Sequence, residues 1–122
     1  MARVTVLCPD LLFGSRLQGS LEAAGHQVWR LDTVEQARGA TPESDLLIVD
    51  LTAEGIDGAK VLQRLREGGE VEGVATMGFY AHVDQETRRQ AIDAGFDRVV
   101  PRSRMAREAP ALVERLVSEG AS

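Results

Sequence analysis

Five short apolar runs, separated by stretches of helical periodicity, constrain the fold of this chain more than any other feature. The clearest run lies in "DLLIVD", residues 45–50, where four successive apolar residues are typical of a central parallel strand buried on both faces. Four further strands are predicted at 3–7, 27–31, 74–79 and 98–100. Because strands that alternate with helices form parallel sheets through right-handed crossovers, the sequence predicts an α/β fold.

The stretches between these strands predict five helices. The second is a short helix over 33–40, in which Thr33 and Gln36 have the spacing of a capping box. Pro110 suits a first helical turn, so the last helix is expected to begin near Glu108. The inward-facing residues of the other helices are predicted to be Phe13, Leu17, Leu21 and Ala24; Val61, Leu62 and Leu65; Ala91 and Ala94; and Leu112, Val113, Leu116 and Val117.

Five such units in 122 residues fit one domain, 1–122, with a flavodoxin-like, doubly wound sheet of strand order 2-1-3-4-5. In this order the strands are added toward one edge of the sheet up to strand two and toward the other edge from strand three, so the switch point lies between strands one and three. Ligands of open α/β sheets bind at that switch point, beyond the carboxyl ends of the strands. The sequence therefore predicts a site formed by the loops at 8–10 and 50–52.

The charge and composition of the chain limit the cellular compartment and the classes of partner that we expect for it. The net charge of −5 and the isoelectric point near 5.0 argue against a nucleic-acid-binding protein, which is normally basic. A single cysteine allows no internal disulfide, and no apolar run approaches the 18 or so residues of a membrane span. We expect a cytoplasmic protein with no membrane association.

Cys8 raises the first alternative for the site, a small cysteine-dependent phosphatase or phosphocarrier. Low-molecular-weight tyrosine phosphatases carry C-x5-R after their first strand, whereas Cys8 and Arg16 are separated by seven residues. Pro9 removes a backbone donor from any phosphate cradle here. The competing interpretation is that Cys8 is a small buried apolar residue at the end of a strand.

The third strand carries a more extensive pattern. In "VDLTAEGIDG", Asp50 stands at the carboxyl end, and Asp57 and Gly58 follow seven and eight residues later. Together with "AGH" after the first helix and "AGFD" after the fourth, this resembles the response-regulator receiver domain of two-component systems. The resemblance implies that Asp50 is the phospho-acceptor position and that Asp57 and Gly58 open the third helix.

The sequence departs from that pattern at several positions. The acidic pair that holds Mg²⁺ in the family falls on Cys8 and Pro9, and Asp10 comes one residue late. Asp50, the Thr52 carbonyl and Asp10 are therefore the remaining candidate metal ligands. Because Mg²⁺ prefers several oxygen ligands and phosphoryl transfer needs the metal, we expect little or no Mg²⁺-dependent phosphorylation.

Two switch positions of the family are also changed. Tyr80 stands near the usual Ser or Thr after strand four, and Arg102 stands at the position of the usual lysine. Arg102 could clamp the Asp50 carboxylate in a fixed ion pair, or point into solvent. Tyr80, in the loop before the fourth helix, either fills the emptied pocket or packs at its rim, and His82 is expected to be solvated.

These observations predict a stand-alone, degenerate receiver-like signalling module of a phosphorelay-type system, without enzymatic activity. It would bind another signalling protein, such as a histidine kinase, or a second copy of itself. We expect no output domain and therefore no DNA binding in cis. The alternative within the fold is a functional response regulator phosphorylated on Asp50, with Asp10 completing the metal site. The expected contact face, helix four–strand five–helix five, carries Arg88, Arg89, Arg98, Arg104 and Arg107.

Overall fold

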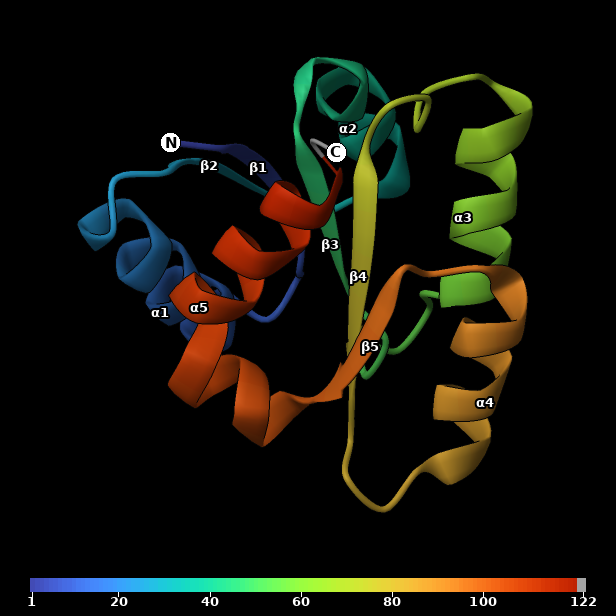
Figure 1. Cartoon of the computed structure of the whole chain (residues 1–122). Coiled ribbons are helices and arrows are strands. Elements are labelled where there is room, and N and C mark those ends of the chain that lie inside the picture. Colours follow the sequence, from blue (N-terminus) through green and yellow to red (C-terminus); the bar gives the residue numbers. More distant parts are fainter. Residues whose placement is uncertain (121–122) are drawn as a thin grey trace.

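A computed structural model, which describes residues 1–120, contains one five-stranded parallel sheet (Figure 1). Its strand order is β2-β1-β3-β4-β5, as the sequence predicts. Every neighbouring pair is parallel, and Asp50 at the end of β3 is aligned with Phe79 of β4. The strands are β1 (Arg3–Leu7), β2 (Gln27–Leu31), β3 (Leu46–Asp50), β4 (Ala75–Tyr80) and β5 (Arg98–Pro101).

Helices cover both faces of this sheet. In Figure 1, α1 and α5 lie on one face, and α3 and α4 lie on the other. A short 3₁₀ turn, Thr41–Glu43, follows α2 and was not predicted from the sequence. The helices are α1 (Leu11–Ala23), α2 (Val34–Ala40), α3 (Gly58–Glu67), α4 (Gln85–Ala94) and α5 (Arg102–Gly120).

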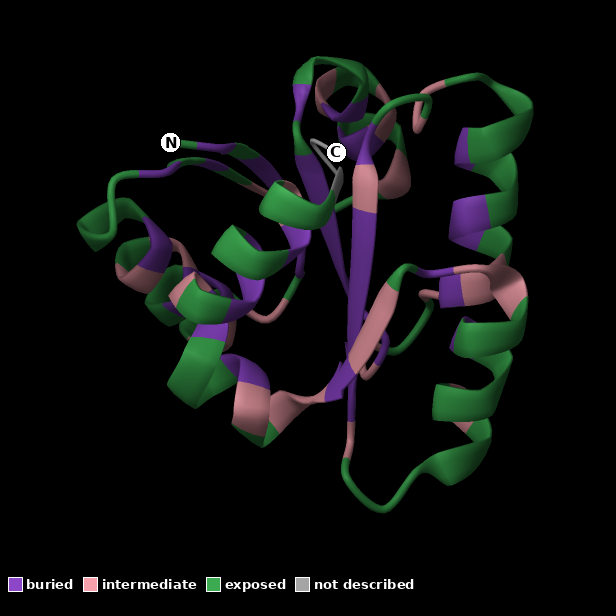
Figure 2. Cartoon of the chain, viewed as in Figure 1, coloured by how far each residue is buried: buried purple, intermediate pink, exposed green. Residues whose placement is uncertain are grey.

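The strands divide their side chains between two apolar clusters, one on each face. Val4, Val6 and Cys8 join the cluster under α1 and α5, whereas Leu7 joins the cluster under α2, α3 and α4. This alternation follows from the two-residue repeat of a strand. Figure 2 shows the result as a buried sheet enclosed by helices whose outer faces are exposed.

The helix starts follow the capping signals in the sequence. Asp10, Asp57 and Asp84 each accept a hydrogen bond from a backbone amide in the first turn of α1, α3 and α4. Thr33 and Gln36 form the predicted capping box of α2. One predicted inward residue is wrong, because Ala24 is exposed just beyond the end of α1.

The last helix consists of two segments joined by a kink: the second starts near Glu108, as predicted, and the first was not predicted. Helical structure begins at Arg102, and the chain is kinked at Glu108, with φ −126° and ψ 15°. The kink lies two residues before Pro110, which lacks the amide that a continuous helix needs. The extra segment forms because it inserts Met105, which is fully buried, into the cluster beneath α1 and α5. Across residues 1–120, no helix is long and apolar enough to span a membrane.

Candidate functional site

The predicted site residues gather at the carboxyl edge of the sheet. Cys8 directly follows β1, Asp50 ends β3, Tyr80 ends β4, and Arg102 directly follows β5. The carboxyl ends of parallel strands meet at one edge, so residues distant in sequence become neighbours there. The contacts among them differ in part from those that the sequence predicts.

Asp50 is a buried carboxylate whose two oxygens are both hydrogen-bonded within the chain. Only 1% of the residue is exposed. Its Oδ1 accepts hydrogen bonds from the Thr52 amide at 2.8 Å and the Thr52 hydroxyl at 2.6 Å. Its Oδ2 accepts a hydrogen bond from the Cys8 thiol at 3.5 Å. Buried carboxylates are costly unless hydrogen-bonded, and these donors meet that requirement.

Cys8 is fully buried and holds its proton. Burial raises the pKa of its thiol to about 12, and the neighbouring Asp50 carboxylate adds to the increase. Nucleophilic cysteines need the thiolate, which a lowered pKa supplies. The environment of Cys8 therefore favours the predicted role of a buried apolar residue over that of a nucleophile. Its thiol can donate to Asp50 Oδ2 or, at 3.6 Å, to the Asp10 carbonyl.

Arg102 does not form the ion pair with Asp50 that was one of its two predicted arrangements. Within residues 1–120, the ion pair of its guanidinium is with Asp10, at 2.8 Å from Nη2 to Oδ2. The guanidinium also lies over the ring of Phe13, 4.3 Å from its centroid. The clamp prediction is wrong because Asp10, at the start of α1, offers a half-exposed carboxylate that needs less desolvation than the buried Asp50 does.

Asp10 is a helix cap that also binds this arginine. Its Oδ1 accepts a hydrogen bond from the Phe13 amide at 3.1 Å, and its Oδ2 faces Arg102. The Phe13 amide and then the Arg102 guanidinium hold the pKa of the Asp10 carboxyl below its usual range. Asp10 is therefore the cap of α1, with both carboxylate oxygens engaged by groups of the chain.

Phe13 connects the arginine to the sheet, a role that sequence reasoning missed. Its ring packs against Phe79 with centroids 5.0 Å apart, and Phe79 is the residue aligned with Asp50 in β4. Helical periodicity identifies Phe13 as an inward-facing residue. The same periodicity gives no signal that one face of the Phe13 ring contacts a cation.

The turn into α3 is built around Leu51, the residue after Asp50. Asp57 caps the helix through the Lys60 amide at 3.3 Å, which supports its predicted structural role. Gly58 and Gly78 leave the space that the Leu51 side chain fills. A Cβ at Gly78 would lie 2.7 Å from Leu51 Cδ1. The glycines are therefore needed for close packing beside Asp50.

Tyr80 lies at the end of β4 and not in the loop where the sequence places it. It is 5% exposed and packs in the cluster under α2, α3 and α4. Cys8, the thiol partner of Asp50, belongs to the cluster on the other face. Tyr80 is therefore a core residue beneath these helices, and His82 is exposed as predicted.

The arginines of the predicted contact face are mostly paired with acids on the same face. Arg89 pairs with Glu86 and Asp93, and Arg98 lies 3.7 Å from Glu119. Arg104 and Arg107 share Glu108, at 3.6 and 3.8 Å, so this part of α5 keeps an excess of positive charge.

The donors at the site do not match the preferences of Mg²⁺. Across residues 1–120, no three side chains of His, Cys, Asp or Glu are grouped so that they could hold a metal ion. Asp50 offers its carboxylate and Cys8 a protonated thiol, whereas Mg²⁺ selects carboxylates, carbonyls and water. Asp10 is directed to Arg102. The residues present therefore do not fit the magnesium site that the resemblance to receiver domains implies.

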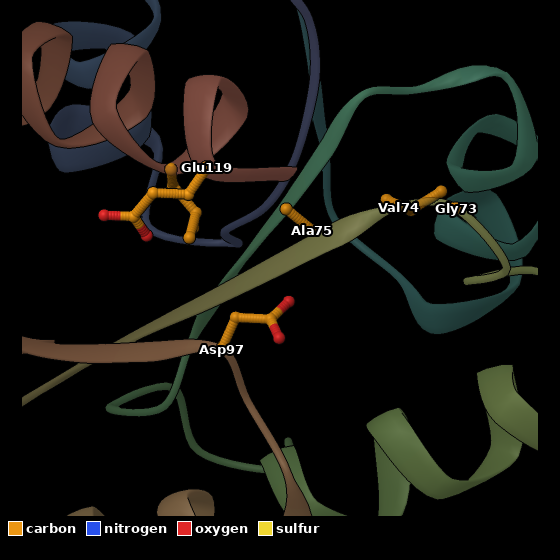
Figure 3. A pocket seen from close by; sticks show the side chains of 6 residues that line it. Gly73, Val74, Ala75, Asp97 and Glu119 are labelled. Atoms are coloured by element: carbon orange, nitrogen blue, oxygen red, sulfur yellow. The ribbon is translucent and has the colours of Figure 1, made fainter. Parts of the chain in front are cut away.

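A separate hollow lies at the opposite, amino edge of the sheet (Figure 3). It has a volume of about 400 Å³ and lies between the start of β4, the residue before β5 and the last turns of α5. Its lining residues are Gly73, Val74, Ala75, Asp97, Leu116 and Glu119. The hollow includes none of the residues around Asp50.

Known structures of receiver domains share this fold. A putative response regulator from Chloroflexus aurantiacus superimposes with a TM-score of 0.84 at 21% identity, covering 96% of this chain and 98% of that chain. A CheY-like receiver domain protein from Methanospirillum hungatei gives 0.83 at 15% identity, over 99% and 97% of the two chains. No protein-family profile and no curated protein matches the sequence.

A longer protein contains the same fold as one part. NtrX from Brucella abortus superimposes with a TM-score of 0.85 at 18% identity, covering 98% of this chain. The present chain spans 28% of that protein. These likenesses confirm the predicted flavodoxin-like fold and its resemblance to receiver domains.

Proposed function

We propose that this chain is a receiver-like signalling module that binds another protein while its acceptor position, Asp50, stays unphosphorylated. One observation carries the proposal: both Asp50 oxygens accept hydrogen bonds from Cys8 and Thr52 in a site closed to solvent. Phosphoryl transfer requires positive charge to neutralise the transferring group. Arg102, the nearest candidate by position in the family pattern, is paired with Asp10.

The proposed contact face is formed by α4, β5 and α5. Arg107 is 72% exposed, and it shares Glu108 with Arg104, which leaves one positive charge in excess at the start of α5. An acidic surface of a signalling protein, such as a histidine kinase, or of a second copy would complement this charge. The activity is one of binding, without catalysis.

Phosphorylation tests the proposal directly. The protein is incubated with acetyl phosphate and Mg²⁺ and its intact mass is measured, with Asp50→Asn as the matched control. We expect neither protein to gain the mass of a phosphoryl group, because Asp50 is given neither a metal nor a free cation. A stoichiometric, hydroxylamine-labile adduct on the wild type that Asp50→Asn lacks would show that the chain is a functional response regulator.

A further inference from the structure

We infer that Cys8 is the residue that keeps divalent cations away from Asp50, because its thiol occupies the side of the carboxylate that a cation would need. This inference deepens the proposed function and rests on its assignment of Asp50 as the acceptor position. It assigns a positioning role to a side chain that the proposed binding activity does not otherwise use.

The geometry around Asp50 is the first step. Oδ1 is held by two donors of Thr52, and Oδ2 faces the Cys8 Sγ atom at 3.5 Å. A magnesium ion bound to Oδ2 would lie about 2.0–2.1 Å from it and would need further oxygen ligands around it. Cys8 is fully buried at this position and supplies a thiol, which is a poor ligand for a hard cation.

The backbone at Cys8 is fixed from two sides. Its amide donates to the Leu31 carbonyl at 3.0 Å, and its carbonyl accepts from the Arg30 guanidinium at 3.0 Å. A side-chain substitution at this position therefore changes the group that faces Asp50 without releasing the loop.

Asp10 does not supply the second carboxylate that a cation bound to Asp50 would need. Its two carboxylate oxygens are committed to the Phe13 amide and to Arg102. Within residues 1–120, no three side chains of His, Cys, Asp or Glu are grouped for a metal ion, so Asp10 does not join Asp50 and Cys8 in such a group. An acidic residue at position 8 would supply the second carboxylate, on the same side as the present thiol.

The test compares Cys8→Asp with the wild type and with Cys8→Ser, which keeps a neutral donor. Mn²⁺ binding is followed by paramagnetic broadening of the Thr52 amide signal in NMR spectra, and thermal unfolding is measured with and without Mg²⁺. In Cys8→Asp, two adjacent carboxylates repel each other, so Mg²⁺ should raise the Tm. Mn²⁺ should bind at least about tenfold more tightly than in the wild type or in Cys8→Ser.

Two results would overturn the inference. One is Mn²⁺ broadening of the Thr52 signal in the wild type at the concentrations that affect Cys8→Asp. The other is a folded Cys8→Asp protein that responds to neither cation. Should Cys8→Asp fail to fold even with Mg²⁺ present, Cys8→Asn decides: its amide oxygen is a hard ligand at the same position without added charge, and it must show broadening at lower Mn²⁺ concentrations than the wild type.

Failure of this inference is distinguishable from failure of the proposed function. Metal binding is measured without a partner and without a phosphodonor, so a missing partner leaves the result for Cys8 intact. Conversely, a phosphoryl adduct on Asp50 of the wild type after incubation with acetyl phosphate would overturn the proposed function, regardless of the Mn²⁺ affinity of Cys8→Asp.

Discussion

Arg102 and Asp10, 92 positions apart in the chain, form an ion pair at 2.8 Å across the carboxyl edge of the sheet. The pair joins the start of α5 to the cap of α1. It also takes away the permanent positive charge that the sequence pattern would direct to Asp50. The acceptor position is left with the neutral donors of Thr52 and Cys8.

The first prediction concerns the stability contributed by Arg102. Arg102→Ala removes the ion pair with Asp10 and the stacking on Phe13 together. We expect the Tm to fall by about 2–5 °C, as for the loss of a partly exposed cation–π contact. Thermal unfolding followed by circular dichroism measures the change.

The matched control is Arg107→Ala, because Arg107 is 72% exposed and its contact is with its neighbour Glu108. That substitution should leave the Tm almost unchanged. Equal decreases of the Tm in the two variants would show that the contacts of Arg102 with Phe13 and Asp10 do not stabilise the fold.

The second prediction is a pH dependence that originates at Asp10. Its pKa is lowered in the folded state, so the charged form stabilises the fold above the unfolded pKa of about 3.9. That stabilisation is lost as the pH falls through the lower folded value. The difference in Tm between the wild type and Asp10→Asn should therefore be largest near neutral pH and shrink below about pH 4.

A series of melting curves from neutral to acidic pH measures this difference. Asp32→Asn is the control, because Asp32 is a more exposed acid paired with Arg30 and caps no helix. A difference between the wild type and Asp10→Asn that stays constant across the acidic range would rule out the proposed origin.

The third prediction tests the packing beside the site. Gly78→Ala would place a methyl group 2.7 Å from Leu51 Cδ1 in the core, and overpacking of this kind costs about 1–3 kcal/mol. Gly39→Ala in α2 meets no atom within 4 Å and should stabilise the protein by about 0.5–1 kcal/mol. Urea denaturation measures both free energies of unfolding.

A double variant identifies Leu51 as the cause. Leu51→Ala removes the side chain that the new methyl group would meet, so the two substitutions together should cost less than the sum of the single costs. Additive costs would mean that Gly78→Ala destabilises the sheet for another reason.

The sequence by itself determined the strand order, the two-sided burial of β3 and the capping box of α2. Apolar periodicity and the Thr33–Gln36 spacing are local signals, and the rule of right-handed crossovers orders the strands. It also identified Asp50 as the residue at the end of the central strand. Because parallel strands place their carboxyl ends at one edge of the sheet, Asp50 was expected to lie at the site.

Only the tertiary structure decided which side chains meet at that edge. The choice of Asp10 over Asp50 as the partner of Arg102 depends on burial and on the position of the Phe13 ring, which no sequence spacing records. The early start of α5 likewise depends on the burial of Met105 in the core. Contacts between distant residues follow from desolvation and packing in three dimensions, whereas periodicity and caps act within a few residues.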